Sequence, residues 1–224
     1  MMGHAGMAAT AVRYLRAVGT TAQPQTSTTS PASPDTAPAP RLRAVGPDER
    51  APVPAAEAVD PAEFRRVLGD FASGVTVVTA RAPASGSAAT GPVGFACQSF
   101  ASLSMEPPLV SFMVARTSTT WPRIARAEGF CVNVLTAEQA QLCRGFAVSG
   151  ADKFAGVAHT PSPVTGSPLL AGVSAWIDCT IHAVHTGGDH LIVVGRVRAL
   201  DAADEPGRPL VFHRGRFGTF APLD

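Results

Sequence analysis

The sequence lacks the features that identify several large protein classes. No stretch approaches the run of about 18 apolar residues that a membrane-spanning helix requires, so no membrane association is predicted. The formal net charge is only +1 and the arginines form no block, so no nucleic-acid-binding surface is indicated. The patterns G-x-G-x-x-G, G-x-x-x-x-G-K-[ST] and G-x-S-x-G are missing. A Rossmann dinucleotide site, a P-loop and a serine hydrolase are therefore not expected.

Metal-binding and redox-active cysteine patterns are also missing. The cysteines contain no C-x-x-C pair, which removes the usual zinc and thioredoxin-like arrangements. Each cysteine lies in an apolar segment, so we expect buried, reduced thiols in a cytoplasmic protein. His182 and His185 are three positions apart on a predicted strand, where side chains at that spacing point to opposite faces. We expect one of them inside and one outside, and no metal site.

The composition divides the chain into two parts. Residues 20–40 consist almost entirely of Pro, Ala, Ser and Thr, with Asp35 as the only charge. Such a segment cannot bury enough apolar surface to offset the entropy of ordering it. Residues 1–19 lack the charge order and the apolar run of a signal peptide. Since Tyr14 is the only aromatic residue before position 60, we predict a disordered extension over 1–59 and one folded domain over 60–224.

Short β segments dominate the folded part. Asp60, Pro61 and Glu63 form a helix start in which Asp60 caps and Glu63 reaches back to the cap amide. β-Branched or alternating segments separated by turns predict strands over 75–81, 93–101, 109–115, 130–135, 174–184, 190–200 and 209–217. Further helices are predicted over 120–127 and, with a capping box at Thr136 and Gln139, over 137–146. This order favours a mainly β, closed antiparallel barrel with a few short helices.

Polar residues gather near the predicted strand ends. Ser99 lies in a segment that ends at Pro107. Residues 116–120 follow a strand and precede a helix, so backbone N–H groups, hydroxyls and the Arg116 guanidinium form a candidate phosphate site. Ordinary capping of the helix by Ser118 or Thr119 accounts for the same residues equally well.

Two single residues are further candidates. Lys153 is the only lysine in a chain with 18 Lys and Arg in total, which favours a position that needs a compact ammonium group. A surface lysine retained by chance is the alternative. His190 follows Gly187-Gly188-Asp189 at a predicted tight turn between two strands. A histidine at a turn is more often without a catalytic role, so the residues alone leave this one open.

The motifs together resemble the flavin reductase family, which has the FMN-binding split-barrel fold of Greek-key type. The resembling stretches follow the family's order and include FRRVLGDFASGVTVVT, VGFACQSFASLSMEPPLVSF, STTWPRI, FCVNVLTAEQ, DKFAG and WIDCTIHAVHTGGDH. They cover nearly all of the folded part. The resemblance is greatest to reductase components of two-component flavin-dependent monooxygenases, such as the hydroxylase of steroid degradation.

The resemblance implies a flavin groove at a dimer interface and assigns residues to it. It places His190 in a catalytic role, facing the nicotinamide and flavin rings, and His182, Arg208 and Pro209 on the nicotinamide side. The implied flavin contacts are Pro92, Val93, Gly94, Phe95, Ala96, Gln98, Ser99, Met113, Val114, Ala115, Ser118, Thr119, Thr120, Gly145, Phe146 and Lys153. Two positions depart from the family pattern: Ala101 replaces a hydroxyl residue, and Thr119 stands where Arg is frequent.

The resemblance further implies an NAD(P)H:flavin oxidoreductase that reduces FMN or FAD and passes the reduced flavin to a partner monooxygenase. It implies a homodimer, a cytoplasmic location, NADH or NADPH as co-substrate and no metal. Other functions remain open: a reductase of a nitro or quinone compound, a flavin-binding split barrel without reductase activity, or an assembly subunit of an oxygenase.

Overall fold

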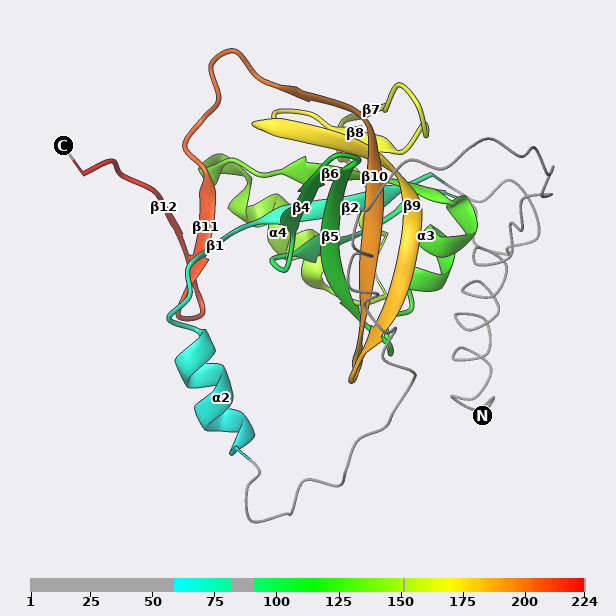
Figure 1. The fold of residues 1–224 in the computed structure, drawn as a ribbon. Coiled ribbons are helices and arrows are strands. Elements are labelled where there is room, and N and C mark those ends of the chain that lie inside the picture. Colours follow the sequence, from blue (N-terminus) through cyan, green and yellow to red (C-terminus); the bar gives the residue numbers. More distant parts are fainter. Residues whose placement is uncertain (1–58, 82–90, 151, 224) are drawn as a thin grey trace, which may run out of the picture.

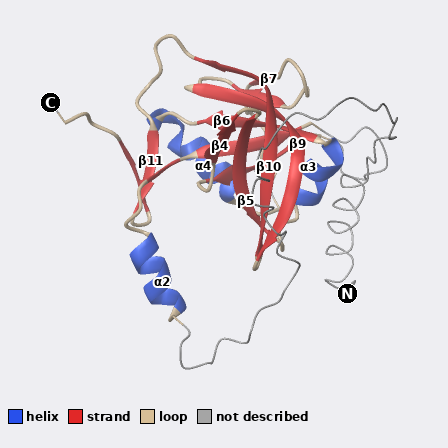
Figure 2. Ribbon diagram, viewed as in Figure 1, coloured by secondary structure: helices blue, strands red, loops and turns tan. Residues whose placement is uncertain are grey.

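The computed structural model describes residues 59–81, 91–150 and 152–223. The extension predicted over 1–59 lies outside the described residues, apart from Val59. The helices are α2 (Pro61–Leu68), α3 (Trp121–Ala127) and α4 (Ala140–Ala147), with a 3-10 turn η2 (Ala137–Gln139) before α4. Strands make up most of the rest, and Figures 1 and 2 show few helices around them. No helix among the described residues combines the length and apolarity that crossing a membrane requires.

Seven antiparallel strands form the main sheet, in the order β3-β2-β6-β9-β10-β5-β4. They are β2 (Thr76–Ala80), β3 (Val93–Cys97), β4 (Ala101–Met105), β5 (Pro108–Ala115), β6 (Gly129–Val134), β9 (Ala175–Gly187) and β10 (His190–Ala202). Only residues 98–100 join β3 to β4, which are the two outer strands. Because four residue steps span at most about 14 Å, the sheet must curl until its edges meet. The predicted antiparallel barrel is confirmed.

Two segments that were predicted as single strands each contain parts of two strands in the structure. The segment 93–101 contains β3 and the start of β4, because the chain bends at 98–100 and moves from one sheet edge to the other. The segment 209–217 is a hairpin of β11 (Leu210–His213) and β12 (Arg216–Thr219). Arg214 and Gly215 both have positive φ in its turn, a conformation that Arg-Gly signals weakly in sequence. The short strands β1 (Ser73–Gly74), β7 (His159–Pro161) and β8 (Pro168–Leu170) were not predicted.

Two apolar clusters lie on the two faces of β2. Val78 and Ala80 belong to the barrel interior, where the Phe112 ring meets Trp121 at 6.3 Å and Phe130 at 5.2 Å between centroids. Val77 packs outside the barrel, in a cluster that includes α4 and β11 residues. Every residue of β2 is therefore buried, since both of its faces are covered.

An arm projects from one side of the barrel. It consists of α2 and the sheet β1-β11-β12, and Figure 1 shows α2 standing away from the barrel at the lower left. Asp60 caps α2 as predicted, accepting from the Ala62 and Glu63 amides at 2.9 Å. Glu63 does not reach back to the cap, because its carboxylate binds Arg66 one turn later. The helix has no buried residue.

A fully buried carboxylate anchors the connection between β7 and β8. Asp178 of β9 is 0% exposed and accepts from the Val164 and Thr165 amides at 2.8 and 3.0 Å and from the Thr165 hydroxyl at 2.6 Å. Its negative charge is thus surrounded by donors, which is the arrangement that a buried carboxylate needs. This side chain therefore ties the loop to β9 of the barrel.

Replacing Asp178 by Ala is expected to lower the free energy of unfolding by about 2–4 kcal/mol, because two part-buried amides and a hydroxyl lose a charged acceptor. Urea denaturation followed by circular dichroism measures the change. Asp204→Ala, at an exposed position, is the matched control and should change stability by less than about 0.5 kcal/mol. Equal midpoints for the two variants would show that Asp178 does not anchor the loop.

Candidate functional site

A cleft of about 1400 Å³ lies between β3 and the C-terminal half of β5. Residues 112–115 of β5 pair with β10 on one side but have no partner in β4 on the other. β3 likewise has a strand neighbour on one side only. The barrel is therefore split here. The predicted flavin contacts that line the cleft are Pro92, Val93, Gly94, Phe95, Ala96, Gln98, Ser99, Met113, Val114, Ala115, Ser118, Thr119, Thr120, Phe146 and Lys153.

Two cationic side chains reach carbonyls at the start of β3. Arg123 Nη2 donates to the Gly91 carbonyl at 2.9 Å, and Lys153 Nζ donates to the Gly94 carbonyl at 3.2 Å. Gly91 precedes β3 and Gly94 lies within it, so these two positive charges contact the cleft wall at two separate points. The wall thus combines backbone polar groups with two cations that suit an elongated, anionic ligand.

Lys153 also ties α4 to β3. Its ammonium donates to the Phe146 carbonyl at 2.9 Å as well as to Gly94, and burial lowers the pKa of the amine. Phe146 packs so closely on β3 that a Cβ on Gly94 would lie 2.9 Å from its ring. Lys153 therefore links α4 to β3 inside the cleft, and it is not a surface lysine retained by chance.

Ser99 holds the two sides of the split together. Its hydroxyl accepts from the Met113 amide at 2.9 Å and donates to the Met113 carbonyl at 3.1 Å. Because both of these hydrogen bonds go to the backbone of Met113, the Ser99 hydroxyl sets the distance between the end of β3 and β5 at this point of the cleft. Gln98, whose side chain is exposed in the same wall, is left as the polar side chain for a ligand.

The turn between β5 and α3 forms one end of the cleft. Ser118 Oγ accepts from the Trp121 amide, the first of α3, at 3.2 Å, although the N-cap residue itself is Thr120. Thr119 and Thr120 line the cleft beside it. The cation here is Arg123 and not Arg116, which is absent from the lining. Arg123 was missed because only the helical spacing from Thr120, three residues earlier, indicates its position.

Arg116 instead fixes the tip of the β9–β10 hairpin. Its amide donates to the Asp189 carbonyl at 3.0 Å and its guanidinium to the Gly188 carbonyl at 3.3 Å. Gly188 has a φ of +69° in this two-residue turn, as the glycine pair predicted. His190 then opens β10 opposite Ala115 and lines the cleft. The hairpin tip is thus positioned by the end of β5.

The His190 ring is oriented by its neighbour. Nδ1 lies 2.8 Å from Asp189 Oδ1, and this hydrogen bond lowers the pKa of the Asp189 carboxyl. Since a carboxylate accepts, Nδ1 carries the proton and Nε2 is left to meet a ligand. Both side chains are exposed, so the ring is accessible.

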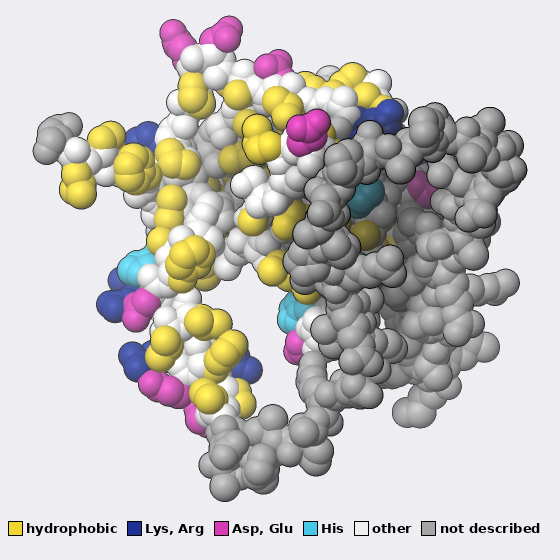
Figure 3. All heavy atoms as spheres, in the orientation of Figure 1, with side chains coloured by type: hydrophobic (Ala, Val, Ile, Leu, Met, Phe, Trp, Pro, Cys, Tyr) yellow, Lys and Arg dark blue, Asp and Glu magenta, His cyan; other side chains and the backbone are white. Residues whose placement is uncertain are grey.

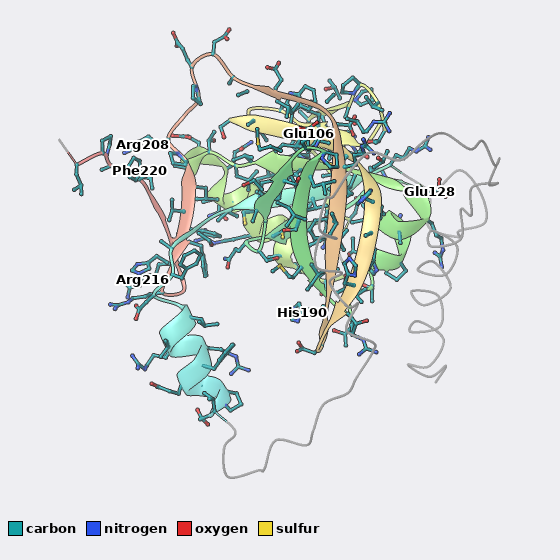
Figure 4. The ribbon with its side chains drawn as sticks, viewed as in Figure 1. Glu106, Glu128, His190, Arg208, Arg216 and Phe220 are labelled. Atoms are coloured by element: carbon teal, nitrogen blue, oxygen red, sulfur yellow. The ribbon has the colours of Figure 1, made fainter. Side chains whose placement is uncertain are left out.

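Four predicted site residues lie outside the cleft lining. Gly145 is exposed on α4, and His182 is exposed on β9. Arg208 and Pro209 lie beside η2: the Arg208 carbonyl accepts from Ala137, and Pro209 forms a bridge with Thr136. Figure 4 shows Arg208 at the upper end of the arm, far from His190 at the lower end of the barrel. The flavin contact predicted for Gly145 and the nicotinamide contacts predicted for His182, Arg208 and Pro209 stay predictions.

The histidine pair of β9 departs from simple alternation. The register shifts beside His182, because Ala183 pairs with Val194 while Ile181 pairs with Gly195. The extra residue of this bulge breaks the period of two. His182 and His185 are consequently both exposed, and the expectation of one inside and one outside was wrong. No group of three or more His, Cys, Asp or Glu that could hold a metal occurs in the described part of the chain.

The remaining walls are largely apolar and were not predicted. Phe154 and His159 extend the α4 side, and Phe212 and Phe217 come from the arm. Arg144 lies over the Phe217 ring at 5.3 Å, which holds the arm to α4. Cys97 and Cys143 also line the cleft, but burial raises the pKa of both thiols, so they remain protonated at neutral pH and are poor nucleophiles.

Comparison with known proteins agrees with this geometry. The family model described as flavin reductase like domain matches residues 68–221. The chain is 50% identical, over 75% of its length and 82% of the relative's, to reductase subunit HsaB of a flavin-dependent monooxygenase from Rhodococcus jostii.

Solved structures give the same result. Nitrilotriacetate monooxygenase component B from Mycobacterium thermoresistibile matches with 44% identity and a TM-score of 0.66, covering 72% of this chain and 87% of that one. NADH:FAD oxidoreductase SgcE6 from Streptomyces globisporus, solved with NAD and FAD fragments, matches with 38% identity and a TM-score of 0.66, covering 74% and 98%. With a split barrel, a family model that spans residues 68–221 and a relative that is 50% identical over 75% of the chain, this chain belongs to the flavin reductase like domain family.

Proposed function

We propose that the protein is an NAD(P)H-dependent flavin reductase that reduces FMN or FAD and releases the reduced flavin to a partner monooxygenase. The cleft carries this proposal. Its volume of about 1400 Å³ exceeds the roughly 300–1,000 Å³ of a site for one small ligand, so it has room for two flat rings. Its lining supplies backbone edges, aromatic side chains and cations.

The chain's residues fit a flavin nucleotide along β3. The strand edge and Gln98 suit the polar edge of a flat ring, and Thr119, Thr120 and Arg123 suit its phosphate. Lys153 and Ser99 keep this wall in place through their contacts with Gly94 and Met113. When bound, the flavin supplies a hydride acceptor and the reduced nicotinamide a donor, so the protein needs only to align them.

His190 is the proposed catalytic residue. It enters from the β5 side of the cleft, opposite the wall formed by β3. Its Nε2 is directed by the bond between Nδ1 and Asp189, so it can orient the nicotinamide or stabilise charge near the rings. The turn that carries it is fixed by Arg116 and therefore holds the imidazole in one place.

Reduced flavin has to leave for a shuttle to work. The His190 and Met113 side chains of the cleft are exposed, which is compatible with release to solvent. The relatives named as monooxygenase reductase subunits support a flavin-dependent monooxygenase as the recipient. All four cysteines are free and buried, which supports a reducing, cytoplasmic location.

The proposed assembly is a homodimer, and α2 supports it. An isolated eight-residue helix is marginal in water, yet α2 exposes the apolar side chains of Phe64, Val67 and Leu68 by half or more. Phe71, just after the helix, is 81% exposed. Figure 3 shows hydrophobic side chains gathered along this arm. A second copy of the chain that covers this face would bury it.

Sedimentation equilibrium is expected to give twice the chain mass of 23.0 kDa. Phe71→Glu places a charge in the proposed interface and should shift the equilibrium toward 23.0 kDa. Leu200→Glu, at another exposed apolar position on β10, is the matched control and should leave the mass unchanged. A measured mass of 23.0 kDa for the wild-type protein would contradict the homodimer.

The reductase activity is tested by following oxidation of NADH and NADPH with and without added FMN, FAD or riboflavin. We expect turnover that rises with free flavin. In stopped-flow experiments, His190→Ala should slow flavin reduction about tenfold to a hundredfold while the flavin Kd changes little, because the imidazole aligns the rings and does not hold the flavin. His185→Ala, at an exposed site outside the cleft, is the control.

The other outcomes separate the alternatives. Flavin binding without turnover would indicate a carrier or sensor, and absence of flavin binding would indicate an assembly subunit. A tightly retained flavin that reduces a nitro or quinone compound would contradict the shuttle. Unchanged flavin reduction in His190→Ala would remove the catalytic role from this residue.

A further inference from the structure

A second histidine lies in the cleft, and the proposed function does not yet use it. His159, the first residue of β7, lines the cleft and is exposed. Its Nδ1 is 2.9 Å from the Val157 carbonyl oxygen. Because a carbonyl can only accept, Nδ1 carries the proton, and Nε2 of the neutral ring is a hydrogen-bond acceptor available to a ligand.

Aromatic contacts fix the direction of this ring. His159 meets Phe154 edge-on at 5.3 Å and 71°, and Phe154 meets Phe146 at 5.1 Å and 90°. Phe146 in turn packs against β3 at Gly94, where no Cβ would fit. The imidazole therefore continues the Phe146–Phe154 ring series on the α4 side of the cleft, and its orientation requires little reorganisation when a ligand binds.

A hydrogen-bond donor lies on the same wall. The Lys153 ammonium has three N–H groups, of which two bind the Gly94 and Phe146 carbonyls. The third is left for a ligand. Asp152 also lines the cleft; its Oδ1 accepts from the Phe154 amide at 3.2 Å, and its other oxygen is a further acceptor. This side of the cleft thus presents the imidazole acceptor His159 Nε2 together with the donor Lys153 Nζ.

This pair complements one part of a flavin. The pyrimidine edge of the oxidised ring carries an N3–H donor between two carbonyl acceptors, and N3–H is the only N–H of that ring. We propose that His159 is a flavin-binding residue whose Nε2 accepts the flavin N3–H, while Lys153 donates to a flanking carbonyl. The inference rests on the proposed flavin-binding role of the cleft and adds the orientation of the ring within it. His190, on the β10 side, is left to the nicotinamide.

The test compares riboflavin with 3-methylriboflavin, which lacks the N3–H, by fluorescence titration of the full chain. The variants are His159→Phe, which keeps an aromatic ring against Phe154 but has no acceptor, and His159→Gln, which restores one. Wild-type protein should bind riboflavin more tightly than its methyl analogue. In His159→Phe this preference should fall roughly three- to tenfold, the worth of one hydrogen bond, and His159→Gln should recover part of it. The KM for NADH should not change.

The matched control is His185→Phe, an exposed histidine on β9 outside the cleft, which should keep the wild-type preference. An unchanged preference in a folded His159→Phe variant would overturn the inference. So would equal weakening of both flavins, since that reports lost packing alone, or a change confined to the KM for NADH. Wild-type protein that binds neither flavin would instead overturn the proposed function itself, and the inference with it.

Discussion

The unpaired outer edge of β3 is the constraint on which the rest of the structure depends. The main sheet closes into a barrel because three residues join its first and last strands, yet β3 and the end of β5 do not form a ladder with each other. Backbone groups at such an edge need partners from elsewhere. Arg123 and Lys153 supply two of them, Ser99 bridges to Met113, and the remaining edge is open to a ligand.

Residues far apart in the chain hold this edge in position. Asn133, which is fully buried on β6, donates to the Val77 carbonyl and accepts from the Leu170 amide, and so attaches β8 to the barrel. Asp178 holds the loop between β7 and β8. Because β7 begins with His159, these two buried polar side chains set the position of one cleft wall. Polar groups inside the protein therefore serve the geometry of the cleft as much as the stability of the barrel.

Local signals in the sequence predicted the parts of the fold that depend on local chemistry. The start of α2 at Asp60, the capping box of Thr136 and Gln139, and the turn before His190 all follow from turn and cap residues. The bend at 98–100 could not be predicted, because the alternating pattern continues through it and only barrel closure requires the break. The resemblance named most of the cleft lining, whereas Arg123 depends on how α3 packs against β3, and His159 depends on its ring contact with Phe154. Side-chain bridges over long sequence distances, such as that of Lys153, leave no pattern in the sequence.

The most direct test of the central role of the β3 edge is hydrogen–deuterium exchange of the full chain with and without FMN. If the split between β3 and β5 is the flavin site, FMN should slow exchange mainly in peptides that cover 91–99 and 112–120, with little change in β4 beyond Ala101. Binding of FMN that leaves both segments unprotected, or that protects a different face of the barrel, would contradict the account.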